Sequence, residues 1–169
     1  MDKKDLEQLK AKASELACKY EQEYGGCSQA VLGALKDTIG GIRDEVFKAG
    51  TGLAGGIGLA GNCCGALTGG VMVLSCYHGR DYAQFSDPEG GRFKSFKIAD
   101  KLLSKFEEEF GTCVCKEIQT KIMGRYYDLR ITSERDAFLE AGGHSDKCPA
   151  VCAKATVFVI DILNEEKLI

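Results

Sequence analysis

Apolar residues recur at intervals of three and four along most of the chain, which is the spacing of one face of an α-helix. Glycines end most of the amphipathic segments, as the pairs at positions 25–26 and 40–41 do. No segment alternates apolar and polar residues over the length of a strand. We therefore predict an all-α, single-domain, multi-helix bundle over residues 1–169. Its helices are expected at residues 4–24, 28–39, 44–49, 65–77, 93–110, 115–123, 132–141 and 149–167.

One stretch breaks the amphipathic pattern: residues 49–79 contain no Asp, Glu, Lys or Arg and are dense in glycine. A membrane span needs about 20 apolar residues, and the length allows one. However, glycine weakens a helix, and Asn62 with two cysteines interrupts the middle. Residues 56–61 also match the dinucleotide-binding pattern G-x-G-x-x-G. That pattern has meaning only between a strand and a helix, and no strand precedes it here.

Close approach of the backbone to a helix or a cofactor explains these glycines better. Glycine has no Cβ to hold neighbouring groups apart, and its exposed N–H can donate a hydrogen bond to sulfur or to an anion. We expect the segment Gly50–Gly70 to be buried between helices.

Composition narrows the class of protein. A net charge of −3 over 169 residues, with no basic stripe, argues against nucleic-acid binding. Residues 1–7 are charged and lack the apolar core of a secretory signal, so we expect a cytoplasmic protein rather than a membrane protein. Structural disulfides are rare in that reducing compartment. The nine cysteines therefore point to metal binding or redox chemistry.

Four cysteines, Cys27, Cys64, Cys115 and Cys148, each stand where a predicted helix begins. A helix N-terminus offers free backbone N–H groups and the positive end of the helix dipole. Such a position lowers the pKa of a cysteine and stabilises the thiolate. Four of them together predict a site that gathers thiolates, for redox work or for a metal.

The other cysteines carry weaker expectations. Cys113 stands two residues before Cys115, and Cys152 lies one helical turn after Cys148, so either could join or replace its neighbour in the site. Free cysteine is otherwise a small, often buried apolar residue. We expect Cys18 and Cys76 to pack as small apolar residues, and Cys63 either to pack or to remain a spare thiol. We expect surface or loop positions for His78 and His144.

The same four cysteines lie in recognisable segments. Residues 26–31 (GCSQAV) and 64–69 (CGALTG) each place a cysteine before small residues and a helix. Residues 110–116 (FGTCVCK) place Cys115 after a Phe-Gly pair, and Cys148 begins an Ala-containing C-terminal helix. Together these segments resemble the redox-active family named for its C…GCAxxG…C…C pattern.

The resemblance extends over residues 24–163 and implies redox activity more firmly than any particular reaction. A related domain occurs in split-Soret cytochromes, which carry haem and have been associated with an iron–sulfur centre. This chain has no C-x-x-C-H segment, so we expect no covalent haem.

Two functions follow from the cysteines, with a third as a structural alternative. In the first, the four thiolates hold a [2Fe–2S] or [4Fe–4S] cluster and the protein transfers electrons to an unidentified redox partner protein. In the second, two of the same cysteines act without a metal as attacking and resolving thiols, although the chain has no C-x-x-C pair. The third is a Cys₄ zinc site, which usually draws on paired cysteine knuckles that this chain lacks. A homodimer is compatible with any of them.

Overall fold

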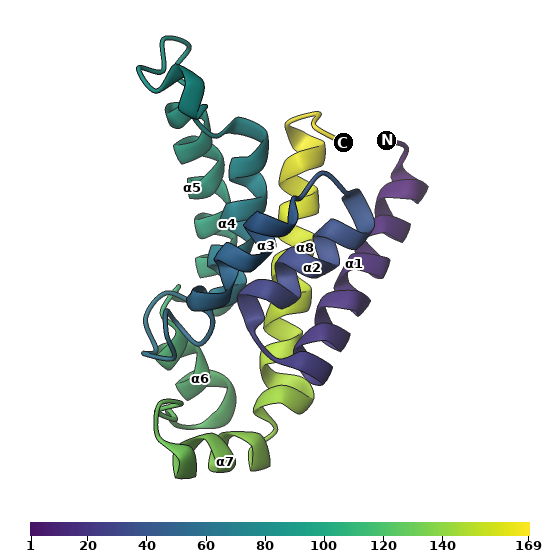
Figure 1. Ribbon diagram of the computed structural model, residues 1–169. Coiled ribbons are helices and arrows are strands. Elements are labelled where there is room, and N and C mark those ends of the chain that lie inside the picture. Colours follow the sequence, from purple (N-terminus) through teal and green to yellow (C-terminus); the bar gives the residue numbers. More distant parts are fainter.

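The computed structural model describes residues 1–169 and contains eight α-helices and no β-strand (Figure 1). The predicted all-α bundle is confirmed. No helix has both the length and the apolar character that crossing a membrane would require. The helices are α1 (Lys3–Tyr24), α2 (Cys27–Ile39), α3 (Asp44–Ala49), α4 (Gly65–His78), α5 (Gly91–Phe110), α6 (Cys115–Met123), α7 (Thr132–Glu140) and α8 (Cys148–Glu165).

Helix α8 forms the centre of the bundle because it is apolar around most of its circumference. It packs against α1, α2, α4 and α5, and Figure 1 shows it between α1 on one side and α4 and α5 on the other. Ile160 and Leu163 on α8 are fully buried, as are Leu32 on α2 and Phe106 on α5. Each such side chain contributes about 1.5–3 kcal/mol on burial, so these contacts are the main source of stability.

Helices α2 and α4 approach each other closely because α4 carries glycine at their contact. A Cβ added at Gly69 would lie 2.5 Å from the carbonyl oxygen of Ser28, which no real Cβ tolerates. This contact places the starts of α2 and α4, and therefore Cys27 and Cys64, at the same end of the bundle.

Helices α6 and α7 cover that end of the bundle, opposite the two chain termini (Figure 1). A second, smaller apolar cluster lies here, formed by Tyr127 and Leu129 from the segment between the two helices and Phe138 from α7. Three short helical turns complete the fold, and sequence periodicity did not predict them: η1 (Gly50–Leu53), η2 (Tyr82–Gln84) and η3 (Gly143–Lys147), the last being a π-helical turn.

The glycine-rich stretch is only partly buried, which corrects the expectation for Gly50–Gly70. Residues 65–70, at the start of α4, lie mostly in the core, whereas residues 51–60 form a turn-rich loop that is mostly exposed or half-buried. No strand precedes residues 56–61, so the context of a dinucleotide-binding motif is absent. The loop bends through positive φ angles at Gly55, Gly56, Ile57, Gly58, Leu59 and Gly61.

Candidate functional site

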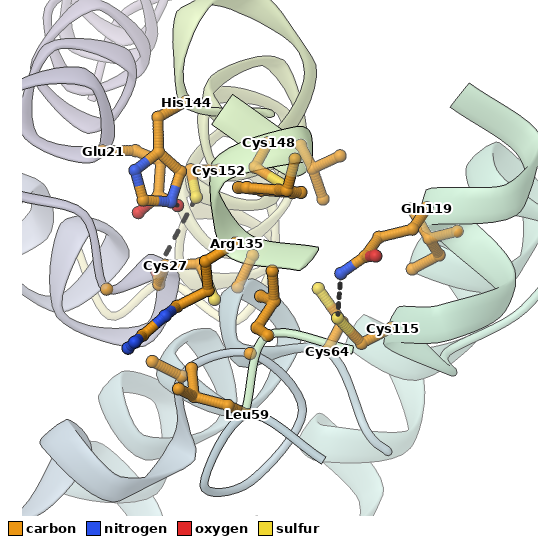
Figure 2. A pocket seen from close by; sticks show the side chains of 18 of the residues that line it. Glu21, Cys27, Leu59, Cys64, Cys115, Gln119, Arg135, His144, Cys148 and Cys152 are labelled. Carbon is orange, nitrogen blue, oxygen red and sulfur yellow. Dashed lines mark hydrogen bonds and ion pairs between the residues drawn. The ribbon is translucent and has the colours of Figure 1, made fainter. Parts of the chain in front are cut away.

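Five cysteines line one cavity of about 250 Å³, between the bundle and its covering helices α6 and α7 (Figure 2). Cys27, Cys115 and Cys148 are the first residues of α2, α6 and α8, and Cys64 immediately precedes α4. Cys152 joins them from the next turn of α8. The structure thus brings together all four cysteines singled out by their helix-start positions, and adds a fifth.

Two antiparallel segments, residues 61–64 and 113–116, position Cys64 and Cys115. The N–H of Cys64 donates to the carbonyl of Cys113 over 2.8 Å, and the N–H of Cys115 donates to the carbonyl of Asn62 over 2.6 Å. These bonds fix the starts of α4 and α6 relative to each other. Both cysteines consequently reach the cavity wall from helices that are far apart in sequence.

The glycine-rich loop reaches the sulfur of Cys27. Gly55 lines the cavity beside Cys27, and the backbone N–H groups of Gly55 and Ser28 favour the thiolate form and so oppose the rise in the pKa of Cys27. This is the close approach of glycine backbone to sulfur that the sequence predicted. It comes from the loop part of the segment rather than from its buried part.

Burial has the largest effect on the pKa values of the cavity thiols, and it raises them. This corrects the expectation that the helix N-termini lower the pKa values of these cysteines. It raises the pKa of Cys64 and of Cys115 to about 12. The N–H groups of Ala66 and Leu67, at the start of α4, act on Cys64 in the opposite direction but are outweighed. Burial and the neighbouring thiols also raise the pKa of Cys148 well above its usual range.

Cys152 differs from the other four because its thiol has a hydrogen-bond acceptor. Its Sγ donates to the backbone carbonyl of Cys27 over 3.7 Å, and the residue is fully buried. That bond requires the proton to stay on sulfur. Cys152 therefore has a structural role that the remaining cavity cysteines lack.

Glu21 and His144 form a polar pair in the cavity that the sequence analysis missed. Glu21 is 2 % exposed, its Oε1 lies 3.5 Å from Nε2 of His144, and its Oε2 has no hydrogen-bond partner. Burial raises the pKa of Glu21 to about 8 and lowers the pKa of His144. At neutral pH the two groups therefore meet as a carboxylic acid and a neutral imidazole. His144 comes from the short turn Gly143–Lys147 and its side chain is 35 % exposed, in line with the expected loop position, and it also lines the cavity.

Gln119 supplies a hydrogen-bond donor to one cavity sulfur. Its Nε2 lies 3.6 Å from Sγ of Cys115 (Figure 2), and its Oε1 accepts from the N–H of Tyr127 over 3.0 Å. The second bond fixes which end of the amide faces the sulfur. Because Gln119 is only 2 % exposed, water does not compete for either bond.

The other cysteines lie outside the cavity. Cys63 and Cys113 are half-buried in the paired segments 61–64 and 113–116, and Cys18 is half-buried on α1. Cys76 on α4 is exposed, so the expectation that it packs inside was wrong. All nine cysteines are free thiols.

The four helix-start cysteines offer thiol donors, the ligand type that iron–sulfur clusters and structural zinc sites both use. No three Cys, His, Asp or Glu side chains converge closely enough to hold one metal ion. The four helix-start thiols instead surround a cavity with an otherwise largely apolar lining.

Comparison with known proteins gives one match. The family model described as "Putative redox-active protein (C_GCAxxG_C_C)" matches residues 26–165. No curated protein and no solved structure matches the chain.

Proposed function

The chain belongs to the C_GCAxxG_C_C family of redox-active proteins, and from this premise we propose that it is an iron–sulfur protein that carries electrons. The proposed ligands are Cys27, Cys64, Cys115 and Cys148. One observation carries the proposal: thiols at the starts of four helices line one cavity. An iron–sulfur cluster, when bound, takes up and releases single electrons.

Thiol acidity favours metal binding over direct thiol chemistry. Burial raises the pKa of Cys64 and so keeps its thiol protonated at neutral pH, whereas thiol–disulfide exchange proceeds through the thiolate. A coordinating metal displaces the proton outright and supplies the positive charge that a buried thiolate needs. Burial of the cavity thiols thus hinders thiol–disulfide exchange by two cysteines, but it is compatible with iron binding by four.

The residues around the proposed ligands would support a bound cluster in different ways. Cys152 keeps its proton because it donates to the carbonyl of Cys27, which leaves four cysteines as ligands. Gln119 donates toward the sulfur of Cys115, and the N–H of Gly55 favours a negative Cys27. These donors favour negative charge on the ligand sulfurs, and the apolar lining excludes water.

An electron carrier also needs a redox partner protein and a compartment in which it works. We include in the proposal a redox partner protein that exchanges electrons with the cluster, and a reducing compartment such as the cytoplasm. The high cysteine content supports the second point, because chains that bind a metal or work through thiols keep them in compartments where disulfides are reduced.

Anaerobic preparation tests the proposal directly. The protein is purified and reconstituted with iron and sulfide without oxygen, and iron, zinc and sulfide are then measured together with the visible absorption spectrum. We expect bound iron and sulfide and a sulfur-to-iron charge-transfer band that bleaches on reduction. Absence of that band after reconstitution would reject the cluster and favour thiol–disulfide chemistry by two of the same cysteines. Zinc without sulfide would indicate the Cys₄ zinc site.

A further inference from the structure

The loop between α4 and α5, together with the start of α5, leaves four large aromatic side chains in solvent. This region lies at one end of the helix pair, and α6 lies toward the other end (Figure 1). The four side chains, here called the aromatic patch, are between 60 and 93 % exposed: Tyr82, Phe85, Phe93 and Phe96. Clustered apolar surface of this kind marks an interaction site in soluble proteins.

Hydrogen bonds hold the loop on the start of α5. The carboxylate of Asp87 accepts from the N–H of Gly91 over 2.7 Å and from the N–H of Arg92 over 3.2 Å. It also pairs with the Arg92 guanidinium over 3.1 Å. A Cβ added at Gly91 would lie 3.3 Å from the carbonyl oxygen of Gly79, so both ends of the loop meet at this glycine. The patch therefore rests on a fixed backbone.

The aromatic rings of the patch are arranged by contacts with one another and with arginines. Phe93 and Phe96 meet edge to face, with ring centroids 6.1 Å apart. The guanidinium of Arg80 lies 4.2 Å from the ring centroid of Phe85, and that of Arg92 lies 4.4 Å from the ring centroid of Phe93. Aromatic rings and arginines are the residues that contribute most to protein–protein interfaces.

Charges of both signs surround the patch and are not paired within the chain. Asp81 and Glu89 from the loop and Lys94 from α5 line one hollow. Lys97 follows Lys94 at a spacing of three residues, which places both on the same side of the helix. The only salt bridge in this part of the chain is the one that Asp87 makes. The two lysines and the two loop acids therefore remain available to a partner.

We propose that the aromatic patch binds the same patch on a second copy of this chain, and that the protein is a two-fold symmetric homodimer. A surface that meets its own copy must carry both members of every pair that forms across the interface. The patch satisfies this condition, because the lysines of one copy face the loop acids of the other. An anionic membrane or an acidic partner protein would instead favour a surface of one sign.

This dimer is independent of the iron–sulfur proposal. The patch shares no residue with the lining of the cysteine cavity, which lies at the end of the bundle covered by α6 and α7 (Figure 1). Each copy therefore keeps its cavity outside the dimer contact, whether or not a cluster is bound.

Molar mass in solution tests the proposal first. Light scattering and sedimentation over a range of protein concentrations should give the mass of two chains. Phe96→Asp places a charge in the interface and should raise the dissociation constant at least about tenfold. Ile57→Asp is the matched control, because Ile57 is 49 % exposed away from the patch and aspartate tolerates its positive φ. This control should dimerise like the wild type, and circular dichroism should show that both variants are folded.

A pair of charge-reversed chains tests the symmetry of the contact. Lys94→Glu with Lys97→Glu in one chain, and Asp81→Lys with Glu89→Lys in another, should each weaken the dimer, because like charges then face each other. A mixture of the two chains pairs opposite charges on both sides, and native mass spectrometry should show that it forms a heterodimer.

Three results would overturn the proposal. The first is a wild-type protein that is monomeric at every concentration, including one that sediments with phosphatidylglycerol vesicles. The second is a Phe96→Asp dimer as tight as that of the wild type. The third is a mixture of the charge-reversed chains that recovers no dimer.

Discussion

The sulfur of Cys27 lies where a side chain of residue 65 would have to stand. A Cβ built on Gly65 would collide with Cys27 Sγ and would lie 3.1 Å from the carbonyl oxygen of Leu53. The glycine that follows Cys64 in the CGALTG segment is therefore required by a cysteine on another helix. It allows Cys27 and Cys64 to share one cavity.

Gly65→Ala should accordingly displace Cys27 and sharply reduce the iron and sulfide bound after anaerobic reconstitution. Gly52→Ala is the matched control, because a Cβ there meets nothing within 4 Å and the residue has no positive φ. Iron and sulfide analysis of the two variants side by side gives the answer. A Gly65→Ala protein with the iron content of the wild type would show that Cys27 is not a ligand.

Gly69→Leu tests the contact between α2 and α4 rather than the cavity. An added side chain meets the backbone of Ser28, which cannot rotate away, so the variant should lose about 1–3 kcal/mol of unfolding free energy. Urea denaturation followed by circular dichroism measures this loss, with Gly52→Leu as the control in open space. Equal midpoints for Gly69→Leu and the wild type would mean that the two helices separate readily in solution.

Much of this arrangement was predictable because it depends on local chemistry. Apolar periodicity marks the helices, and glycines mark their ends, so the bundle and the helix-start positions of Cys27, Cys64, Cys115 and Cys148 follow from sequence alone. The sequence left open whether Cys152 joins the site, and it did not predict that burial would raise the pKa values of the thiols. Both depend on how deeply α8 sits among its neighbours, which is a property of the whole packing.

Glu21 shows what sequence reasoning missed. It continues the series Ala13, Ala17, Glu21, whose four-residue spacing follows the buried face of α1. A charged residue in such a series is a detectable sign of a buried polar site. His144 gave no comparable sign, because it comes from a π-helical turn that periodicity does not reveal.

The buried acid should make stability depend on pH. Burial raises the pKa of Glu21 from an ordinary 4.5 to about 8, so the folded state holds a proton that the unfolded state releases between these values. The contribution to stability is fully present below pH 4.5 and is lost as pH rises toward 8, by up to about 1.4 kcal/mol per pH unit. Unfolding free energies of the metal-free protein across this range measure the loss.

Glu21→Gln is the matched variant for that experiment, since it keeps the shape and removes the titration. The difference in unfolding free energy between Glu21→Gln and the wild type should grow in favour of the variant from pH 4.5 to pH 8 and then level off. Parallel pH profiles for the two proteins would contradict a buried, protonated Glu21.

Gln119 should tune the potential of a bound cluster. Its amide donates toward Cys115 Sγ, and a donor to sulfur favours the more negative, reduced state. Loss of about 1 kcal/mol from such a bond corresponds to a one-electron potential lower by on the order of 40 mV. Gln119→Leu should show this fall in a redox titration. Gln119→Met, which keeps a side chain of similar length and lacks the N–H donor, should also lower the potential, whereas an unchanged value in both would exclude the role.

The five cavity cysteines should not be equivalent. Single replacement by serine of Cys27, Cys64, Cys115 or Cys148 removes a proposed ligand, and each variant should lose most of its reconstituted iron and its charge-transfer band. Cys152→Ser keeps a donor for the carbonyl of Cys27, and this variant should retain both. Iron analysis and visible spectra of all five, prepared together without oxygen, decide the ligand set. If Cys152→Ser lost its iron while Cys148→Ser kept it, the fourth ligand would be the cysteine one turn further along α8.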